Sequence, residues 1–285
     1  MQLPIEQIPP SDFPSLLREI PDPPAQLYVQ GALPSTHAKI LAVVGSRKCT
    51  PYGKEVVSYL LKGLRGYDIS ILSGLALGID GHAHTTALEN NLHTLAVPGS
   101  GLSEKALYPR SHVPLARNIL RAGGGLLSEY APEQTAAPWT FPQRNRIMAG
   151  MAHAVLVVEA TERSGTLITA RLATEYNREL LIVPNSIFVE SSKGAHQFLK
   201  LGATPVTTPE DILDVLGIQR EEKETTYLHL SAPEQIIYDL LATPMERDEL
   251  AKNIKLSATE INILLSKLEL DGVIIERLGM VRRTE

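Results

Sequence analysis

The feature that most constrains the fold is a pattern that occurs three times: a short apolar run breaks into a loop of small residues that opens a helix. The runs are 41–44, 69–72 and 154–158, and glycine, serine or threonine takes over at 45–46, 73–78 and 164–166. In an open parallel sheet such loops meet at the carboxyl edge of the strands, where ligands bind. Backbone N–H groups at helix N-termini attract anions to that edge, phosphates above all. The chain is therefore predicted to hold phosphate groups at one edge of a sheet.

Apolar runs alternate with amphipathic segments from residue 39 to 216, which predicts an α/β fold with an extended Rossmann-like, doubly wound, mostly parallel sheet. The expected strands are 40–45, 69–73, 94–97, 125–128, 154–159, 180–183 and 204–207. The expected helices are 52–65, 80–89, 111–121, 143–150, 166–176, 194–201 and 209–215. Two helix ends carry capping signals, since Asn177 suits a left-handed stop and Thr208-Pro209 suits a start.

Three flanking segments differ from this domain in composition. Residues 1–38 are rich in proline and are expected to form a lead-in that wraps the domain at 39–216, with one short helix near 11–19. Residues 217–230 are polar and predict a linker. Residues 231–285 are predicted to form a small winged-helix domain. Its expected elements are helices at 233–241, 246–253 and 259–270 and a hairpin at 273–277 and 280–283.

Composition narrows the class of protein. The single cysteine, Cys49, excludes an internal disulfide and fits a reducing compartment. No apolar run approaches the roughly 18 residues of a membrane span, and the N-terminus lacks a signal-peptide pattern, so a cytoplasmic location without membrane contact is expected. Residues 39–216 carry 17 Lys/Arg and 15 Asp/Glu, a net charge of +2, whereas residues 231–285 carry 7 and 10, a net charge of −3. Nucleic-acid binding therefore requires a local basic groove rather than bulk charge.

The first candidate binding loop is Gly45-Ser46-Arg47. Glycine allows close approach of a ligand, serine supplies a hydroxyl, and the arginine fork matches phosphate oxygens and can stack on a base. The alternative is a strand-end turn with a solvated arginine. The loop lacks the full G-x-G-x-x-G pattern, which gives little support to a dinucleotide cofactor.

The second candidate loop runs from Ser73 to Asp80. Gly74 and Gly78 are four residues apart and allow an anion-binding concavity before the helix. Asp80 would repel a phosphate, so we expect it to cap the helix N-terminus. His82 and His84 fall on different helix faces, and a metal site is not expected there.

The third candidate segment combines Phe141, Arg144, Asn145 and Arg146. Aromatic rings among arginines are typical of single-stranded nucleic-acid sites, because rings stack on bases while cations hold the backbone. The alternative is a buried pair of Phe141 and Trp139 with surface arginines. Pro142 is expected to keep Phe141 outside the helix that follows.

Two further loops complete the candidate site. Ser164, Gly165 and Thr166 form a third possible phosphate cradle, and Lys193 adds a mobile cation. The sequence contains no nucleophile elbow, no P-loop, no H-E-x-x-H and no cysteine in a catalytic setting. The protein is therefore expected not to be an enzyme, and neither a metal nor a cofactor is expected.

Together these segments resemble one family closely, the bacterial DNA-processing proteins A (DprA), also called Smf. The matching stretches are 44–47, 73–84, 141–147, 164–170 and 192–203. The resemblance covers about residues 20–216, with a family-like winged helix after the linker. It implies an extended Rossmann domain that binds single-stranded DNA without a nucleotide cofactor. The helical N-terminal domain common in the family is expected to be absent or reduced, because residues 1–38 are too few for it.

The resemblance also implies a role and partners. Members of the family bind incoming single strands in natural transformation, protect them and help to load the RecA recombinase despite single-strand-binding protein. They typically act as dimers through the Rossmann domain. The expected partners are therefore single-stranded DNA, RecA, single-strand-binding protein and a second copy of the chain. By position, Gly45, Ser46 and Arg47 would line the DNA pocket, with Phe141, Arg144, Asn145 and Lys193 nearby.

An alternative function is that of a Rossmann-type nucleotide phosphoribohydrolase. This enzyme group carries a G-G-x-G-T-x-x-E loop, whereas Thr166 is followed here by Leu167-Ile168-Thr169, so the glutamate is missing.

The role of the winged helix is also open. Segment 257–271 has one basic residue, Lys267, against Glu260, Glu269 and Asp271, which disfavours tight duplex binding and favours partner docking. Accessory DNA contacts are the alternative, through Arg277, Arg282 and Arg283.

Overall fold

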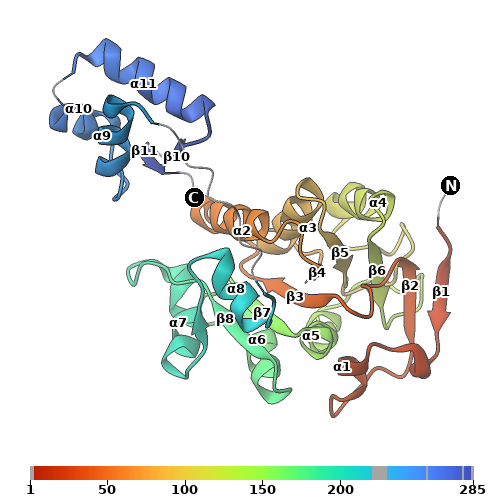
Figure 1. Cartoon of the computed structure of the whole chain (residues 1–285). Coiled ribbons are helices and arrows are strands. Elements are labelled where there is room, and N and C mark those ends of the chain that lie inside the picture. The colour runs from red at the N-terminus through yellow and green to blue at the C-terminus, as the bar shows by residue number, and fades with distance from the viewer. Residues whose placement is uncertain (1–2, 220–229, 255, 278, 284–285) are drawn as a thin grey trace. The chain divides into compact units, whose positions relative to one another are not determined.

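The structure is a computed structural model, and it describes residues 3–219, 230–254, 256–277 and 279–283. The chain divides into two compact units, Met1–Arg220 and Glu221–Glu285, and each is described by itself. The first unit is a nine-stranded, mostly parallel sheet with helices on both faces, which confirms the predicted fold class (Figure 1).

The strand order of the sheet is β1-β2-β6-β5-β4-β3-β7-β8-β9. From β6 to β9 along this order all neighbours are parallel, whereas β2 pairs antiparallel with both β1 and β6. The strands are β1 (Ile5–Ile8), β2 (Leu27–Gly31), β3 (Lys39–Val44), β4 (Ile69–Ser73), β5 (His93–Ala96), β6 (Gly125–Ser128), β7 (Ala154–Val157), β8 (Glu179–Ile182) and β9 (Thr204–Pro205).

The direction of winding reverses between β3 and β7. From β3 the chain proceeds through β4 and β5 to β6, and it then returns to place β7 on the other side of β3. Such a switch point opens a crevice at the carboxyl ends of the two strands, where open α/β sheets bind their ligands. The loops that follow β3 and β7 therefore occupy the position that favours a ligand.

Helices cover both faces because both faces of the sheet are apolar. One face carries α2 (Pro51–Gly63), α3 (Ile79–Glu89), α4 (Val113–Arg121) and α8 (Pro209–Val215) (Figure 1). The other carries α1 (Ser15–Arg18), α5 (Thr140–Met151), α6 (Thr166–Glu175) and α7 (Lys193–Lys200). Short 3-10 turns are η1 (Pro10–Asp12), η2 (Arg110–His112) and η3 (Glu190–Ser192). Leu41 on β3 and Leu60 on α2 are fully buried, and burial of each such side chain stabilises the folded state by roughly 1.5–3 kcal/mol.

The N-terminal segment contributes more than the short helix expected near 11–19. Residues 5–8 and 27–31 form β1 and β2, which extend the sheet beyond β6. The prolines at 9, 10, 14 and 21 lie in the connection between these strands. This fits the rule that proline, which cannot donate to a ladder, is kept out of paired strand interiors.

The prediction that Pro142 excludes Phe141 from a helix is wrong, because α5 begins at Thr140. The first four N–H groups of a helix have no intrahelical partner, so a proline in the first turn removes no hydrogen bond. The two capping predictions are confirmed. Asn177 has φ 59°, and the Thr208 side chain accepts a hydrogen bond from the Asp211 N–H in a capping box.

The second unit has the predicted winged-helix elements around a core of its own. They are α9 (Ala232–Leu240), α10 (Arg247–Asn253), α11 (Ala258–Leu270) and an antiparallel hairpin of β10 (Ile274–Arg277) and β11 (Met280–Arg283). Ile237, Leu250, Leu265 and Val281 form part of the core. Residues 220–229 of the predicted linker and Leu278 of the predicted hairpin turn lie outside the described residues.

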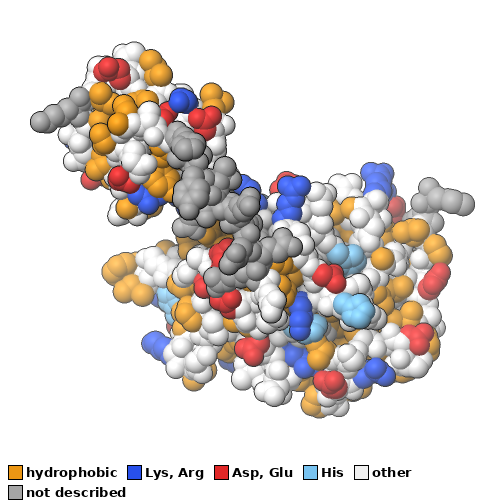
Figure 2. Space-filling model, viewed as in Figure 1, with side chains coloured by type: hydrophobic (Ala, Val, Ile, Leu, Met, Phe, Trp, Pro, Cys, Tyr) orange, Lys and Arg blue, Asp and Glu red, His pale blue; other side chains and the backbone are white. Residues whose placement is uncertain are grey.

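On the visible face of the first unit, basic, acidic and histidine side chains are interspersed, and on that of the second unit basic and acidic side chains are (Figure 2). Any binding site for a polyanion must therefore be local. Among the described residues, no helix combines the length and the apolar character that crossing a lipid bilayer requires.

Candidate functional site

The loop after β3 is built for close contact with the start of α3. Gly45 is buried, and a Cβ at this position would lie 2.6 Å from the Ile79 side chain. The Ile79 N–H donates to the Ser46 carbonyl at 3.1 Å, and the Ser46 hydroxyl accepts from the Lys48 N–H at 3.1 Å. Within the described part of the chain, the N–H groups of Gly45, Ser46 and Arg47 donate to no protein acceptor. They are therefore available to an anion.

Arg47 extends from this loop over an aromatic ring. Its guanidinium carbon lies 5.0 Å from the centroid of the Phe141 ring, which is within cation–π distance. Tyr108 packs on the same ring at 5.7 Å, tilted by 56°, and is 46% exposed. Arg47 itself is exposed and forms no ion pair with any described residue. We call Arg47, Phe141 and Tyr108 the aromatic ledge.

A buried arginine joins the loops beneath the ledge. Arg144 is 4% exposed, and its Nη1 donates to the Gly74 carbonyl at 2.7 Å and to the Val97 carbonyl. Its Nε donates to Asn145 Oδ1 at 3.2 Å. Burial lowers the pKa of Arg144 to about 10, so the guanidinium stays charged at neutral pH. A Cβ on Gly74 would lie 2.2 Å from Arg144 Nη1, so glycine makes room for this contact.

Asp80 does not cap α3, contrary to the sequence expectation. The N-cap position is Gly78, with φ 78°, and Asp80 lies in the first turn with its carboxylate accepting from the Gly74 N–H at 3.1 Å. Burial raises the pKa of Asp80, and the nearby charge of Arg144 opposes that rise. The acid thus compensates a buried cation instead of facing a ligand. In the loop between Gly74 and Gly78, Leu75 adopts φ 56°. This conformation is unusual for a leucine and indicates that the surrounding structure fixes the loop.

The loop after β7 is tied to the loop after β3 across the switch point. The Thr166 hydroxyl donates to the Gly45 carbonyl at 3.0 Å, and the Ser164 hydroxyl accepts from the Thr166 N–H at 3.2 Å. Asn145 reaches the same loop, since its Nδ2 donates to the Gly165 carbonyl at 3.4 Å. The structure therefore brings four predicted segments together: 45–47, 74, 141–145 and 164–166.

Lys193 begins α7, and the first turn of this helix is anchored to the segment after β7. The Gly194 N–H donates to the Ala160 carbonyl at 3.0 Å, and a Cβ on Gly194 would lie 2.4 Å from the Thr161 carbonyl oxygen. The Lys193 ammonium pairs with the Glu190 carboxylate at 2.7 Å, which raises the pKa of the lysine. Lys193 is thus a partly neutralised cation beside the loop cluster.

Two predicted site residues are engaged in the fold instead. The Ser73 hydroxyl is buried and donates to the Val43 carbonyl of the neighbouring strand at 2.6 Å. Arg146 is buried and contacts the Glu129 carboxylate at 2.6 Å and the Asp22 carbonyl at 2.8 Å. Neither side chain faces the ledge.

The structure also decides two points about the aromatic residues. The buried pair of Phe141 and Trp139 is not formed, because Trp139 is 57% exposed and packs edge-on against Tyr130 at 5.9 Å. Sequence reasoning missed Tyr108. Its only signal was an aromatic residue directly before a proline, between two predicted elements.

Comparison with known proteins places these features in a family. The family model of DNA recombination-mediator protein A matches residues 7–217, and that of the DprA winged helix domain matches residues 221–279. Protein Smf of Escherichia coli is 43% identical over 204 residues, which cover 72% of this chain and 54% of that protein. DNA processing protein DprA of Streptococcus pneumoniae is 40% identical over 201 residues, 70% of each chain. The chain thus spans about half the length of the Escherichia coli relative.

Two solved structures share the fold. DNA processing protein A from Streptococcus pneumoniae matches with a TM-score of 0.69 and 37% identity, over 76% of this chain and 75% of that one. DNA processing protein A from Helicobacter pylori, whose structure is described as showing a single-stranded DNA binding mode, matches with a TM-score of 0.65 and 27% identity, over 76% of this chain and 98% of that one.

Proposed function

The chain belongs to the family of DNA recombination-mediator protein A, and from this premise we propose that it binds single-stranded DNA at the loops that follow β3 and β7. The observation that carries the proposal is the exposed guanidinium of Arg47 over the Phe141 ring, beside the backbone N–H groups of residues 45–47; within the described ranges the guanidinium has no ion-pair partner and these N–H groups have no acceptor. The cation and the N–H groups match the phosphates of a nucleotide strand, and the ring matches the faces of its bases.

The ledge favours single strands over duplex. Bases in a duplex are stacked and paired, whereas those of a single strand are free to stack on Phe141 and Tyr108. Such stacking tolerates any base, because every base has a π-face. The proposed binding is therefore independent of sequence, and it should weaken with salt as phosphates exchange counterions for protein cations.

In the cell, the proposed role is to protect incoming single strands during natural transformation and to help load a RecA-class recombinase onto them despite single-strand-binding protein. This role requires binding and release without bond cleavage, so we propose that the protein is not an enzyme. The two buried carboxylates near the loops support this proposal, because each is hydrogen-bonded to the backbone of the fold. Asp80 accepts from the Gly74 N–H, and Glu159 accepts from the Thr50 N–H at 2.9 Å. Its DNA and recombinase partners would be met in the cytoplasm.

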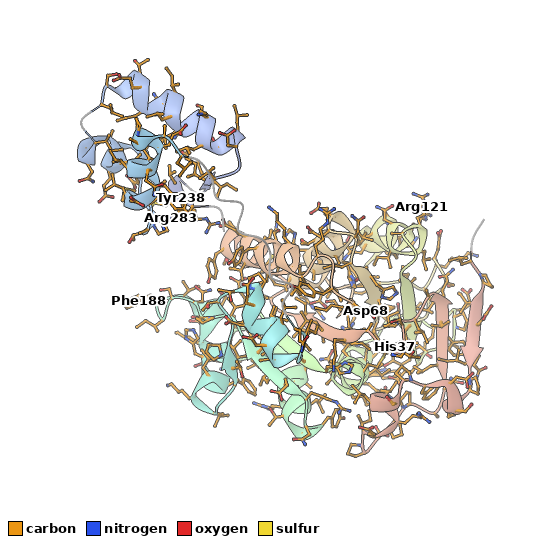
Figure 3. The ribbon with its side chains drawn as sticks, in the orientation of Figure 1. His37, Asp68, Arg121, Phe188, Tyr238 and Arg283 are labelled. Carbon is orange, nitrogen blue, oxygen red and sulfur yellow. The ribbon has the colours of Figure 1, made fainter. Side chains whose placement is uncertain are left out.

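We further propose that the protein forms a homodimer through the first unit. Its three most exposed large apolar side chains lie close together in sequence: Ile187 at 71%, Phe188 at 90% and Leu201 at 80%. Phe188 projects from the tip of the loop between β8 and α7 (Figure 3). Sedimentation equilibrium should give twice the chain mass, and Leu201→Glu should shift it toward the monomer. A monomeric wild type would contradict the dimer.

Fluorescence anisotropy with labelled oligo-dT, and with a duplex of equal length, tests the central proposal. The wild type should prefer the single strand, and Arg47→Ala should weaken that binding about tenfold or more, since a phosphate contact and the cation over the ring are both lost. The matched control is Lys62→Ala, an exposed cation on α2, which should change affinity by less than about twofold.

Equal effects of Arg47→Ala and Lys62→Ala would contradict the assignment of the loops as the DNA site. No binding by the wild type would contradict the function itself. The phosphoribohydrolase alternative is tested by incubation with AMP and detection of released adenine. None of the relatives and structures compared above is described as such a hydrolase.

A further inference from the structure

A hollow of about 600 Å³ lies beside the aromatic ledge, on the face of the sheet that carries α2, α3 and α4. These three helices are neighbours along that face (Figure 1). The hollow is bounded by the loop after β3, the first turns of α2 and α3, η2 and the first turns of α4. We call it the α3–α4 groove. Arg47 lines it, so it is continuous with the ledge.

The lining of the groove has one sign of charge. It includes Arg47, Lys48 and Lys54, together with His82 and His112, and none of its lining residues is an aspartate or a glutamate. Among the described residues, neither Lys48 nor Lys54 has an ion-pair partner, and both are exposed. Cations that gather around one hollow without an acidic residue in its lining concentrate positive potential there.

Two glycines of α3 and the loop before it allow the walls of the groove to pack closely against each other. A Cβ on Gly78 would lie 2.2 Å from the Ser46 carbonyl oxygen, and one on Gly81 would lie 2.4 Å from His112 Cε1. His112 is held in turn, since its Nδ1 lies 2.8 Å from the Leu75 carbonyl oxygen. The wall between the 73–78 loop and the groove is therefore a packed contact with defined shape.

We propose that the α3–α4 groove is a second subsite for the same single strand, where Lys48 and Lys54 hold the phosphates of nucleotides that continue beyond the ledge. The proposal rests on the proposed function, because it concerns the path of the strand. A nucleic-acid backbone fits the groove better than a free nucleotide would, because the lining is polar and cationic and contributes no exposed aromatic ring of its own for a base. Arg47 links the two subsites, since it lies 5.0 Å from the Phe141 ring and also lines the groove.

Oligonucleotide length separates the two subsites experimentally. The test measures anisotropy with oligo-dT of about 4 nucleotides, enough for the ledge, and of about 16 nucleotides, enough for both. The variant is the double substitution Lys48→Ala/Lys54→Ala. Its matched control is Lys62→Ala/Arg65→Ala, which removes the same charge from exposed positions outside the groove.

The Lys48→Ala/Lys54→Ala variant should bind the long oligonucleotide about tenfold more weakly, and its log–log salt slope should fall in magnitude by about 1.4, corresponding to two phosphates. Its affinity for the short oligonucleotide should stay within about twofold of the wild type, as should the control's affinity for both lengths. If the groove variant binds both lengths like the wild type, or loses both equally, the second subsite does not exist. If the wild type binds neither length, the proposed function fails instead.

Discussion

Arg144 and Arg47 lie in the same loop cluster, but one guanidinium is buried and the other is exposed. Arg144 contacts carbonyls of the loops after β4 and β5, and Asp80 supplies the opposing charge. Arg47 has the Phe141 ring as its neighbour and forms no ion pair with any described residue. The buried residue fixes the loops, which leaves the exposed one free to bind.

This division predicts that Arg144→Met destabilises the protein. The substitution leaves the Asp80 carboxylate buried without its cation and the Gly74 and Val97 carbonyls without a donor. Each buried polar group left without its hydrogen-bond partner costs about 1–3 kcal/mol of unfolding free energy. Denaturant unfolding measures the loss, with the exposed Arg171→Met as control. A loss below about 1 kcal/mol would show that Arg144 does not hold the loops.

Residue types and spacing predicted loops that the structure brings together, and geometry explains where the other residues lie. The loops at 45–47 and 164–166 follow adjacent strands, so their meeting follows from the alternation of strands and helices. Arg144 and Arg146 could not be distinguished from sequence. They lie two residues apart on α5, so they point to different sides, one to the loops and one to Glu129. Tyr108 belongs to no motif, and only the fold brings it to Phe141.

Among the elements, α9 is one whose N-terminus depends on a titrating carboxylate. Ser231 and Glu234 form a capping box, and Glu234 also pairs with Lys267 of α11 at 2.6 Å. The hydrogen bonds from Lys267 and Ser231 lower the pKa of Glu234 to about 2. One carboxylate thus joins the N-terminus of α9 to α11.

The second unit should therefore lose stability in acid. A carboxyl with a depressed pKa stabilises the fold above its unfolded pKa of about 4.3, and that contribution disappears as pH falls toward 2. Hydrogen exchange of amides in α9 and α11 should accelerate over this interval relative to Glu234→Gln, which lacks the titrating group. The exposed Glu269→Gln is the control. Equal pH dependence in the wild type and Glu234→Gln would contradict this role.

The elements that the sequence did not predict are β1 and β2. Each is four or five residues long, and a proline-rich connection separates them. Strands this short show too little alternation of apolar and polar residues to be recognised among the prolines. β1 pairs antiparallel with β2, and β2 pairs antiparallel with β6, which joins residues over 90 positions apart, as in Tyr28 with Ser128. Contacts of this range are not encoded in local propensity.

For the whole molecule, the distribution of charge favours the first unit over the second as the place of the proposed DNA binding. Segment 39–216 of the first unit has a net charge of +2, whereas 231–285 has a net charge of −3. Of the three wing arginines, the side chain of Arg277 lies outside the described part of the structure. Arg283 stacks on Tyr238 at 4.1 Å, and its Nε donates to the Tyr238 carbonyl at 2.7 Å (Figure 3). Contacts within its own unit thus occupy this cation.

Arg283→Ala should therefore leave the affinity for oligo-dT within about twofold of the wild type while it lowers the stability of the second unit. Anisotropy gives the affinity, and hydrogen exchange in α9 and β11 gives the stability. A loss of affinity as large as that of Arg47→Ala would instead support accessory DNA contacts by the wing.

The most direct test of the account is to find which residues touch the bases. Oligo-dT that carries 5-iodouracil is irradiated in complex with the full chain, and the crosslinked peptide is identified by mass spectrometry. We predict crosslinks at Phe141 or Tyr108, the two rings of the ledge, and their loss when both are replaced by leucine. Crosslinks confined to the second unit, for example at Tyr238, would contradict the proposal that single-stranded DNA binds at the loops that follow β3 and β7.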